Sequence, residues 1–213
     1  MSTTTINAIN EFWLGDCLSS REAAFARKNW WYAGGHKVDD EIRSRFGDFV
    51  MRACDRQLPD WPSTGHGALA VILLLDQFTR NIYRHSTKAY CGDALALEIV
   101  KDVIANNLDI QLHPVERIWL YHPFHHSEEL REQDCGLTLL NEVHSAAPAA
   151  WQGYVKRSIE GWIRHRDIVV KFGRFPHRND LFERASTPTE LAFFAQGSET
   201  FGQGRKPQLL HSC

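Results

Sequence analysis

Apolar residues recur at the spacing of one helix face along almost the whole chain. The first predicted helix carries its apolar face on Ile6, Ile9, Phe12 and Trp13. Gly15 follows directly and suits the left-handed turn that closes many helices. Strict alternation of apolar and polar residues, which would indicate strands, is not found in any segment.

Three more helices are expected in the first half of the chain. One starts with Asp39 as its N-cap and stops at Pro59, because proline cannot continue a helix. The second covers residues 68–81 and opens on an apolar run of eight residues. Leucine and alanine dominate that run and a polar stripe follows it, so we predict a buried helix and not a strand. The third covers residues 86–107, with Ser86 or Thr87 as its cap.

The second half predicts helices over residues 114–123, 127–144, 148–172 and 187–197. Ser127, followed by two glutamates, is a typical helix start. Thr187 opens a capping box with Glu190, and Gly173 is placed as a C-cap. Gly153 and Gly161 lower the helix propensity of the long segment, so we expect close helix crossings there.

About eight helices without a sheet predict an all-α fold, either an irregular bundle or a superhelix of stacked helix pairs. No change in composition marks a domain boundary. We therefore expect a single helical domain over residues 1–197 and a loosely ordered tail over 198–213.

Composition removes several classes of function. Among 213 residues, 24 are Lys or Arg and 26 are Asp or Glu, giving a net charge of −2. This balance argues against a nucleic-acid binder, which would carry a basic excess. An apolar run of eight residues is also far short of the roughly 20 that a membrane helix needs. Five scattered cysteines without a C-x-x-C pair, and an N-terminus without a signal peptide, predict a reduced cytoplasmic protein.

The helix over residues 68–81 is predicted to carry one polar stripe after its buried start. At 100° per residue, its polar side chains fall within about 140° of one another. They are Asp76, Gln77, Arg80, Asn81 and Arg84. If the stripe lies in the interior, charges on other helices have to match it, since an unpaired buried charge is costly. The alternative is a structural Asp76–Arg80 ion pair with the rest facing water.

Histidines gather before the helix predicted at Ser127. His122, His125 and His126 are spaced 0, 3 and 4, and Glu128 follows. This spacing permits a metal site. However, Pro123 interrupts the helix between the histidines, so packing and capping roles are the alternative.

A basic turn follows the long helix. From Arg164 to Arg178 there are five Lys or Arg residues against one Asp. A helix C-terminus favours cations without any function. The turn itself, with Arg174, His177, Arg178 and Asn179, offers several forked donors suited to carboxylate or phosphate.

Four blocks resemble the motifs of a largely bacterial family, domain of unknown function 924. They are Phe12–Gly15, Leu69–Arg84, Pro123–Glu128, and His165–Asp167 together with Phe172–Asn179. The resemblance extends from about residue 8 to 196. It implies an all-helical fold related to tetratricopeptide-like superhelices, and no established activity. The family usually has proline where this chain has Thr79, and a proline would bend the helix at this point and redirect the polar residues that follow it.

We hypothesise that these blocks meet in one pocket that binds a small anionic ligand. Arg80, Arg174 and Arg178 would hold the anion, with Gln77, Asn81, Arg84 and Asn179 as further ligand contacts. His126, His165 or His177 would transfer protons, with Glu128 or Asp76 orienting them. A divalent metal on His126, Glu128, His165 and His177 is a minority alternative, and no cofactor is required.

The second hypothesis is an interaction scaffold for a protein partner, in which the same polar residues form structural ion pairs. It expects these residues to be paired and dry, with Trp30, Trp31 or Trp61 exposed on a concave surface. Neither a reaction type nor a substrate follows from the sequence, and whether the chain is an enzyme stays open.

Overall fold

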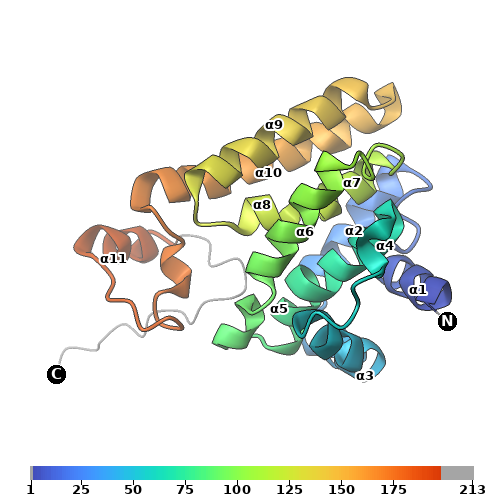
Figure 1. Ribbon diagram of the computed structural model, residues 1–213. Helices are drawn as coiled ribbons and strands as arrows, with labels where there is room; N and C mark the ends of the chain where they lie inside the picture. The colour runs from blue at the N-terminus through green and yellow to red at the C-terminus, as the bar shows by residue number, and fades with distance from the viewer. Residues whose placement is uncertain (1, 198–213) are drawn as a thin grey trace.

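The computed structural model describes residues 2–197, which form an all-α fold without a strand (Figure 1). The longer helices are α1 (Ser2–Leu14), α2 (Arg21–Ala33), α3 (Gly35–Cys54), α4 (Gly65–Ile72), α6 (Asp93–Ala105), α7 (Pro114–Leu120), α9 (Leu130–Ala146), α10 (Ala149–Phe172) and α11 (Pro188–Ala195). The shorter turns are η1 (Trp61–Ser63), η2 (Leu73–Phe78), α5 (Thr79–Ile82), η3 (Thr87–Tyr90), α8 (His122–His126) and η4 (Pro176–Arg178).

The centre of the molecule is the continuous segment α4–η2. Residues 68–75 are all buried, which confirms the predicted buried helix. Helix α4 packs against α1, α6 and α7, and η2 packs against α3 and α6. The apolar run therefore needs no polar face, because neighbouring helices surround it.

An aromatic cluster joins the N-terminal helices to this centre. The Trp13 ring lies 5.6 Å from Phe78 and 5.1 Å from Trp119, edge-on to the latter. Trp31 donates its indole N–H to the Trp13 carbonyl at 3.0 Å. Such edge-to-face pairs add to the stabilisation that burial already provides.

Helices α9 and α10 form an antiparallel pair along one edge of the molecule, with α8 beneath them (Figure 1). Their close approach depends on Gly136. A Cβ atom at this position would lie 2.7 Å from Phe124 Cβ and 2.9 Å from the Trp162 ring. The missing side chain of Gly136 thus lets α8 and α10 pack onto α9.

Gly136→Ala is expected to lower the free energy of unfolding by about 1–3 kcal/mol, because the added methyl overpacks the α8–α9–α10 contact. Gly161→Ala is the matched control on α10, where a Cβ would meet no atom closer than 3.9 Å. That control should raise stability by about 0.5–1 kcal/mol through helix propensity. Urea unfolding of both variants gives the comparison, and an equal loss in both would contradict the role of Gly136.

The structure corrects the predicted N-terminal half. Helix α2, capped by the Ser20 hydroxyl, was not predicted. Helix α3 starts at Gly35, where φ is +57°, and not at Asp39. Asp39 is instead buried in α3, where it pairs with residues that follow η2. Helix α3 also ends at Cys54, before Pro59.

Other boundaries differ for local reasons. The helix predicted over 86–107 is broken at Gly92, which packs against the Leu75 backbone more closely than a Cβ would allow. Pro123 lies in the first turn of α8 and does not end a helix. Gly153 and Gly161 lie at no close crossing.

The C-terminal predictions hold better, except that α9 begins after Glu129 and Ser127 closes α8 instead of capping a helix start. Thr187 and Glu190 form the predicted capping box of α11. Gly173 closes α10 with φ +68°, as expected for a left-handed C-cap. The predicted tail over 198–213 lies outside the described residues. In the described part of the chain, every helix is too short or too polar to cross a bilayer.

Candidate functional site

The candidate site lies where the π-helix η2, α8 and the segment from α10 to η4 meet. Asp76 is at its centre and is fully buried. It lies within η2, whose wider turns hold more residues than an α-helix because the bonds run from i to i+5. Thr79 and Arg80 follow η2 directly. Thr79 donates its hydroxyl to the Leu75 carbonyl at 2.7 Å, and Arg80 pairs with Asp76.

Three side chains surround the Asp76 carboxylate. His126 Nδ1 lies 2.8 and 2.9 Å from its two oxygens. Arg80 approaches to 3.2 Å, as the predicted i, i+4 pair. The Gln77 amide donates at 2.6 Å. The buried negative charge is therefore compensated, as burial requires.

Arg80 is shared with a second carboxylate that the sequence did not indicate. Its two terminal nitrogens donate to the two oxygens of Asp93 at 2.8 and 2.9 Å, in the bidentate geometry typical of arginine. Asp93 is the first residue of α6. The sequence placed it inside the helix predicted over residues 86–107 with no motif for its role, so its pairing required the tertiary fold.

The contact with Asp76 determines the state of His126. A carboxylate paired with arginine can only accept, so Nδ1 carries the ring proton and Nε2 keeps a lone pair. Burial and the nearby Arg80 hold the pKa of His126 well below 6.5. Nε2 makes no hydrogen bond with any residue from 2 to 197. A neutral ring of this kind is suited to accept a proton.

Three other imidazoles lie in contact with His126 or with one another. The His125 ring is 5.1 Å from that of His126 and 3.8 Å from that of His165, and it stacks on Trp162. The His122 ring is 5.5 Å from that of His126, and its Nδ1–H donates to the Ile118 carbonyl at 2.8 Å.

Burial lowers the pKa of every imidazole in this cluster, which we call the imidazole cluster: His122, His125, His126, His165 and His177. The pKa falls to about 4 for His122 and to about 3 for His165. The cause is the cost of placing a charge in the interior, to which neighbouring arginines add. The rings are therefore neutral at pH 7.

Arg178 is the cation of the site that has no carboxylate partner among residues 2–197. It is only 7% exposed, and its guanidinium donates to the His126 carbonyl at 2.9 Å. The guanidinium carbon lies 4.7 Å from the Tyr90 ring and 4.5 Å from the Phe175 ring. Burial lowers the pKa of Arg178, but a guanidinium stays charged.

Three buried polar atoms, on Arg178, on the tyrosine that it faces and in the imidazole cluster, have no hydrogen-bond partner among residues 2–197. They are Arg178 Nε, Tyr90 Oη and His125 Nδ1. Native proteins leave few such atoms unpaired, and clusters of them mark sites for an ion, water or ligand.

The predicted polar stripe is divided by the fold. Asp76, Gln77 and Arg80 face the site, whereas Asn81 and Arg84 face α3. Asn81 and Arg84 both bind Asp39, at 2.6 and 2.8 Å. The wide turn of η2 is the reason, because it shifts the residues that follow relative to an ideal α-helix. The prediction that other helices supply matching charges is confirmed.

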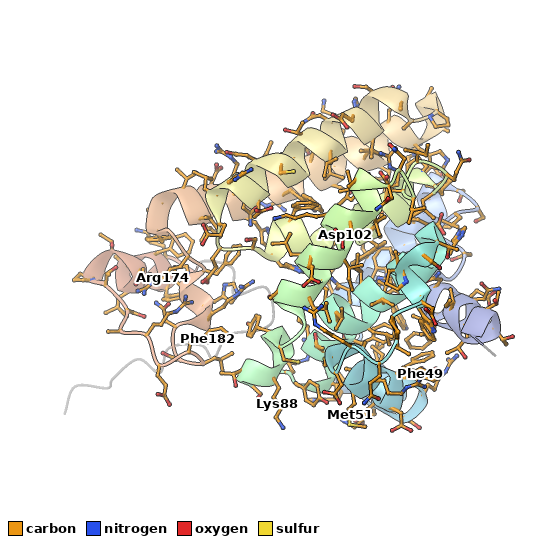
Figure 2. All side chains as sticks on the ribbon, viewed as in Figure 1. Phe49, Met51, Lys88, Asp102, Arg174 and Phe182 are labelled. Atoms are coloured by element: carbon orange, nitrogen blue, oxygen red, sulfur yellow. The ribbon has the colours of Figure 1, made fainter. Side chains whose placement is uncertain are left out.

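The residues of the basic turn also have different partners, since only some of them face the site. Arg174 binds Glu190 of α11 at 2.7 Å, and the Asn179 amide shares the same carboxylate at 3.3 Å. Figure 2 shows Arg174 and Phe182 on the C-terminal segment. Glu128 accepts from Arg184 at 2.7 Å and from the Phe175 N–H at 2.8 Å. It therefore holds the C-terminal segment in place and does not orient an imidazole.

The sequence did not indicate five of the residues that complete these contacts: Asp39, Tyr90, Asp93, Phe175 and Arg184. No motif assigned any of them to the site, although Phe175 lies inside the block Phe172–Asn179. Tyr90 packs against Phe182 with ring centres 5.4 Å apart. Only the packing of distant segments brings these residues to the polar blocks.

Two other features of the hypothesis can be compared with the structure. Among residues 2–197, no three His, Cys, Asp or Glu side chains are arranged to hold a metal ion. A cavity of about 380 Å³ exists, but it lies between α3, α4 and α6 and is lined by none of the site residues. The site is a packed cluster that reaches the surface at His126, whose side chain is 16% exposed.

Comparison with known proteins assigns the chain to a family. None of the curated proteins matches it. A solved structure of a protein of unknown function from Agrobacterium tumefaciens is 28% identical, with a TM-score of 0.74, and the match covers 92% of this chain and 100% of that one. The family model described as "Bacterial protein of unknown function (DUF924)" matches residues 9–198. The chain therefore belongs to the DUF924 family.

Proposed function

We propose that the chain binds a small carboxylate or phosphate anion at Arg178 and acts on it with His126 as the proton-transfer group. The observation that carries the proposal is the buried Arg178 guanidinium without a carboxylate partner among residues 2–197. A buried cation without a direct ion-pair partner is costly, and a bound anion would offset that cost.

The pairing of the buried charges supports this ligand. Asp76 and Asp93 carry two negative charges, and both are taken up by Arg80. Arg178 brings the total charge of these four groups to zero, but neither carboxylate lies within ion-pair distance of it among residues 2–197. Arg178 Nε and Tyr90 Oη supply unused polar atoms at the same place. An anion at this place would give Arg178 a direct ion-pair partner without disturbing the existing pairs.

His126 gives the site a chemical option besides binding. Asp76 fixes its ring orientation and tautomer, and its Nε2 remains available as a base. Asp76 acts here as a positioning residue. Proton abstraction from a bound acid, or activation of a water molecule, is the reaction class that this pair supports. Which of these two reactions takes place depends on the bound ligand.

The test is thermal unfolding with inorganic phosphate or acetate at constant ionic strength. We expect at least one anion to raise the melting temperature of the wild type in a saturable way. Arg178→Met should abolish that increase while keeping the contacts with Tyr90 and Phe175. Without anion, Arg178→Met should stay within about 1 kcal/mol of wild type, because the lost hydrogen bond is offset by removal of a buried charge.

Arg166→Met is the matched control, since Arg166 pairs with Asp134 at the surface. It should retain the increase seen with the wild type. An anion effect that persists in Arg178→Met, or that is absent from the wild type, contradicts the proposal.

A protein-interaction scaffold of tetratricopeptide-like type is the second candidate. Its support is the number of polar residues already paired between segments, such as Arg84 with Asp39 and Arg174 with Glu190. Against it, Trp30, Trp31 and Trp61 pack with the core instead of lining an exposed surface. An anion without effect on the wild type would favour the scaffold.

A further inference from the structure

Cys54 and Cys91 lie side by side although 37 residues separate them. Their sulfur atoms are 3.4 Å apart. Cys54 is the last residue of α3, and Cys91 directly follows η3. Figure 2 labels Met51 and Lys88, which lie three residues before each cysteine on the same two elements.

The fold holds this pair in place from both sides. Next to Cys91, Gly92 packs tightly against the Leu75 backbone of η2. Helix α3 packs against η2 and α5, which fixes the position of its C-terminal end. Two thiols on independently anchored segments stay close without a covalent bond between them.

The two thiols differ in their surroundings. Cys91 is exposed and Cys54 is partly buried. The hydrogen bond from the Cys54 thiol lowers the pKa of Cys91 to about 7, and Lys88 acts in the same direction, against burial and Asp93. The same hydrogen bond raises the pKa of Cys54, and burial and Asp55 add to this. Cys91 is thus the thiol that forms a thiolate first.

We propose that Cys54 and Cys91 form a redox-active dithiol that is oxidised to a disulfide by hydrogen peroxide. The Cys91 thiolate attacks one peroxide oxygen, the O–O bond breaks, and Cys91 becomes a sulfenic acid while hydroxide takes up a proton to give water. Cys54 sulfur then attacks Cys91 sulfur. The S–S bond forms, the S–O bond breaks, and the Cys54 proton leaves with the hydroxide as a second water. Two thiols lose two electrons, and one peroxide is reduced to two waters.

The position of Cys91 connects this pair to the candidate site. Tyr90, the residue before it, lies against Arg178, and Asp93, two residues after it, binds Arg80. A disulfide would tie this short stretch to the end of α3. The dithiol chemistry itself does not depend on the proposed anion site.

The test is treatment of the full-length reduced chain with hydrogen peroxide, followed by peptide mapping by mass spectrometry without reductant. We expect a peptide pair linked through Cys54 and Cys91, lighter by two hydrogens, which dithiothreitol separates. Cys54→Ser should stop the reaction at the first step, so that Cys91 is labelled by a sulfenic-acid reagent such as dimedone. Cys91→Ser should leave Cys54 unlabelled.

Cys135→Ser is the matched control, because Cys135 is also exposed but burial raises its pKa. The 54–91 link should form in this variant, and equally in Cys213→Ser. Oxidation of Cys91 to sulfinic acid without a link, or reaction of Cys91 no faster than Cys135, would overturn the proposal.

Discussion

Lowering the pH from 7 to 5 is expected to reduce the free energy of unfolding by more than about 4 kcal/mol, which is enough to unfold a marginally stable domain. The imidazole cluster is the cause. In the folded chain the pKa of each ring is depressed, to about 4 for His122 and about 3 for His165. In the unfolded chain each ring returns to a pKa near 6.5.

The direction of this change in unfolding free energy follows from proton binding. Below pH 6.5 the unfolded chain binds protons that the folded chain excludes, so stability rises with pH between about 4 and 6.5 and is flat above. Each imidazole contributes up to about 1.4 kcal/mol per pH unit in this window. Carboxylates such as Glu190, whose pKa is lowered to about 2, lose their contribution only below 4.5. The two effects therefore occupy different pH ranges.

Urea unfolding at intervals from pH 7.5 to 5 measures the slope. His125→Phe, which keeps a ring stacked on Trp162, should reduce the slope by about one proton. His36→Gln removes an exposed imidazole of α3 outside the cluster and should leave the slope as in the wild type. A stability that does not change between pH 7 and 5 would show that the rings are protonated equally in both states.

The second large effect is expected from Asp76→Asn, which should lower the free energy of unfolding by about 3–5 kcal/mol. The substitution keeps the size of the side chain but removes the charge that faces Arg80 and His126. Arg80 and Arg178 would then share a single buried counter-charge, Asp93. The midpoint of urea unfolding reports the loss, with an unchanged m-value as the sign of a folded ground state.

Asp40→Asn is the control for this comparison. Asp40 pairs with Arg43 at 2.7 Å, but its side chain is 72% exposed. Solvent screening makes such pairs worth no more than about 0.5 kcal/mol. A cost for Asp76→Asn as small as for Asp40→Asn would mean that the buried charges are compensated without Asp76.

Prediction of the fold succeeded where local signals act alone. The buried run over residues 68–75, the capping box at Thr187 and the C-cap at Gly173 depend on hydrophobicity and backbone preferences that adjacent residues determine. Helix α2 was missed because its charged residues and its aromatic residues stand in separate groups, without a clear apolar face. Boundaries near Asp39 and Gly92 were misplaced because tertiary packing decides them.

Prediction of the site was partial for a different reason. The four sequence blocks contain Asp76, Arg80, His126 and Arg178, and the fold brings these residues together. The blocks also named Arg174 and Glu128, whose partners on other segments hold them in structural pairs. Residue type alone does not separate a paired arginine from an unpaired one.

The sequence by itself determined that the chain is helical, which of its segments are buried, and which polar residues have no packing reason to be there. The tertiary structure alone decided which charges meet, that Arg178 is left without a carboxylate among residues 2–197, and that Cys54 approaches Cys91. Helix formation depends on neighbours three or four residues apart, which the sequence displays. Charge pairing, pKa and thiol proximity depend on through-space distances between segments tens of residues apart, which only the folded chain sets.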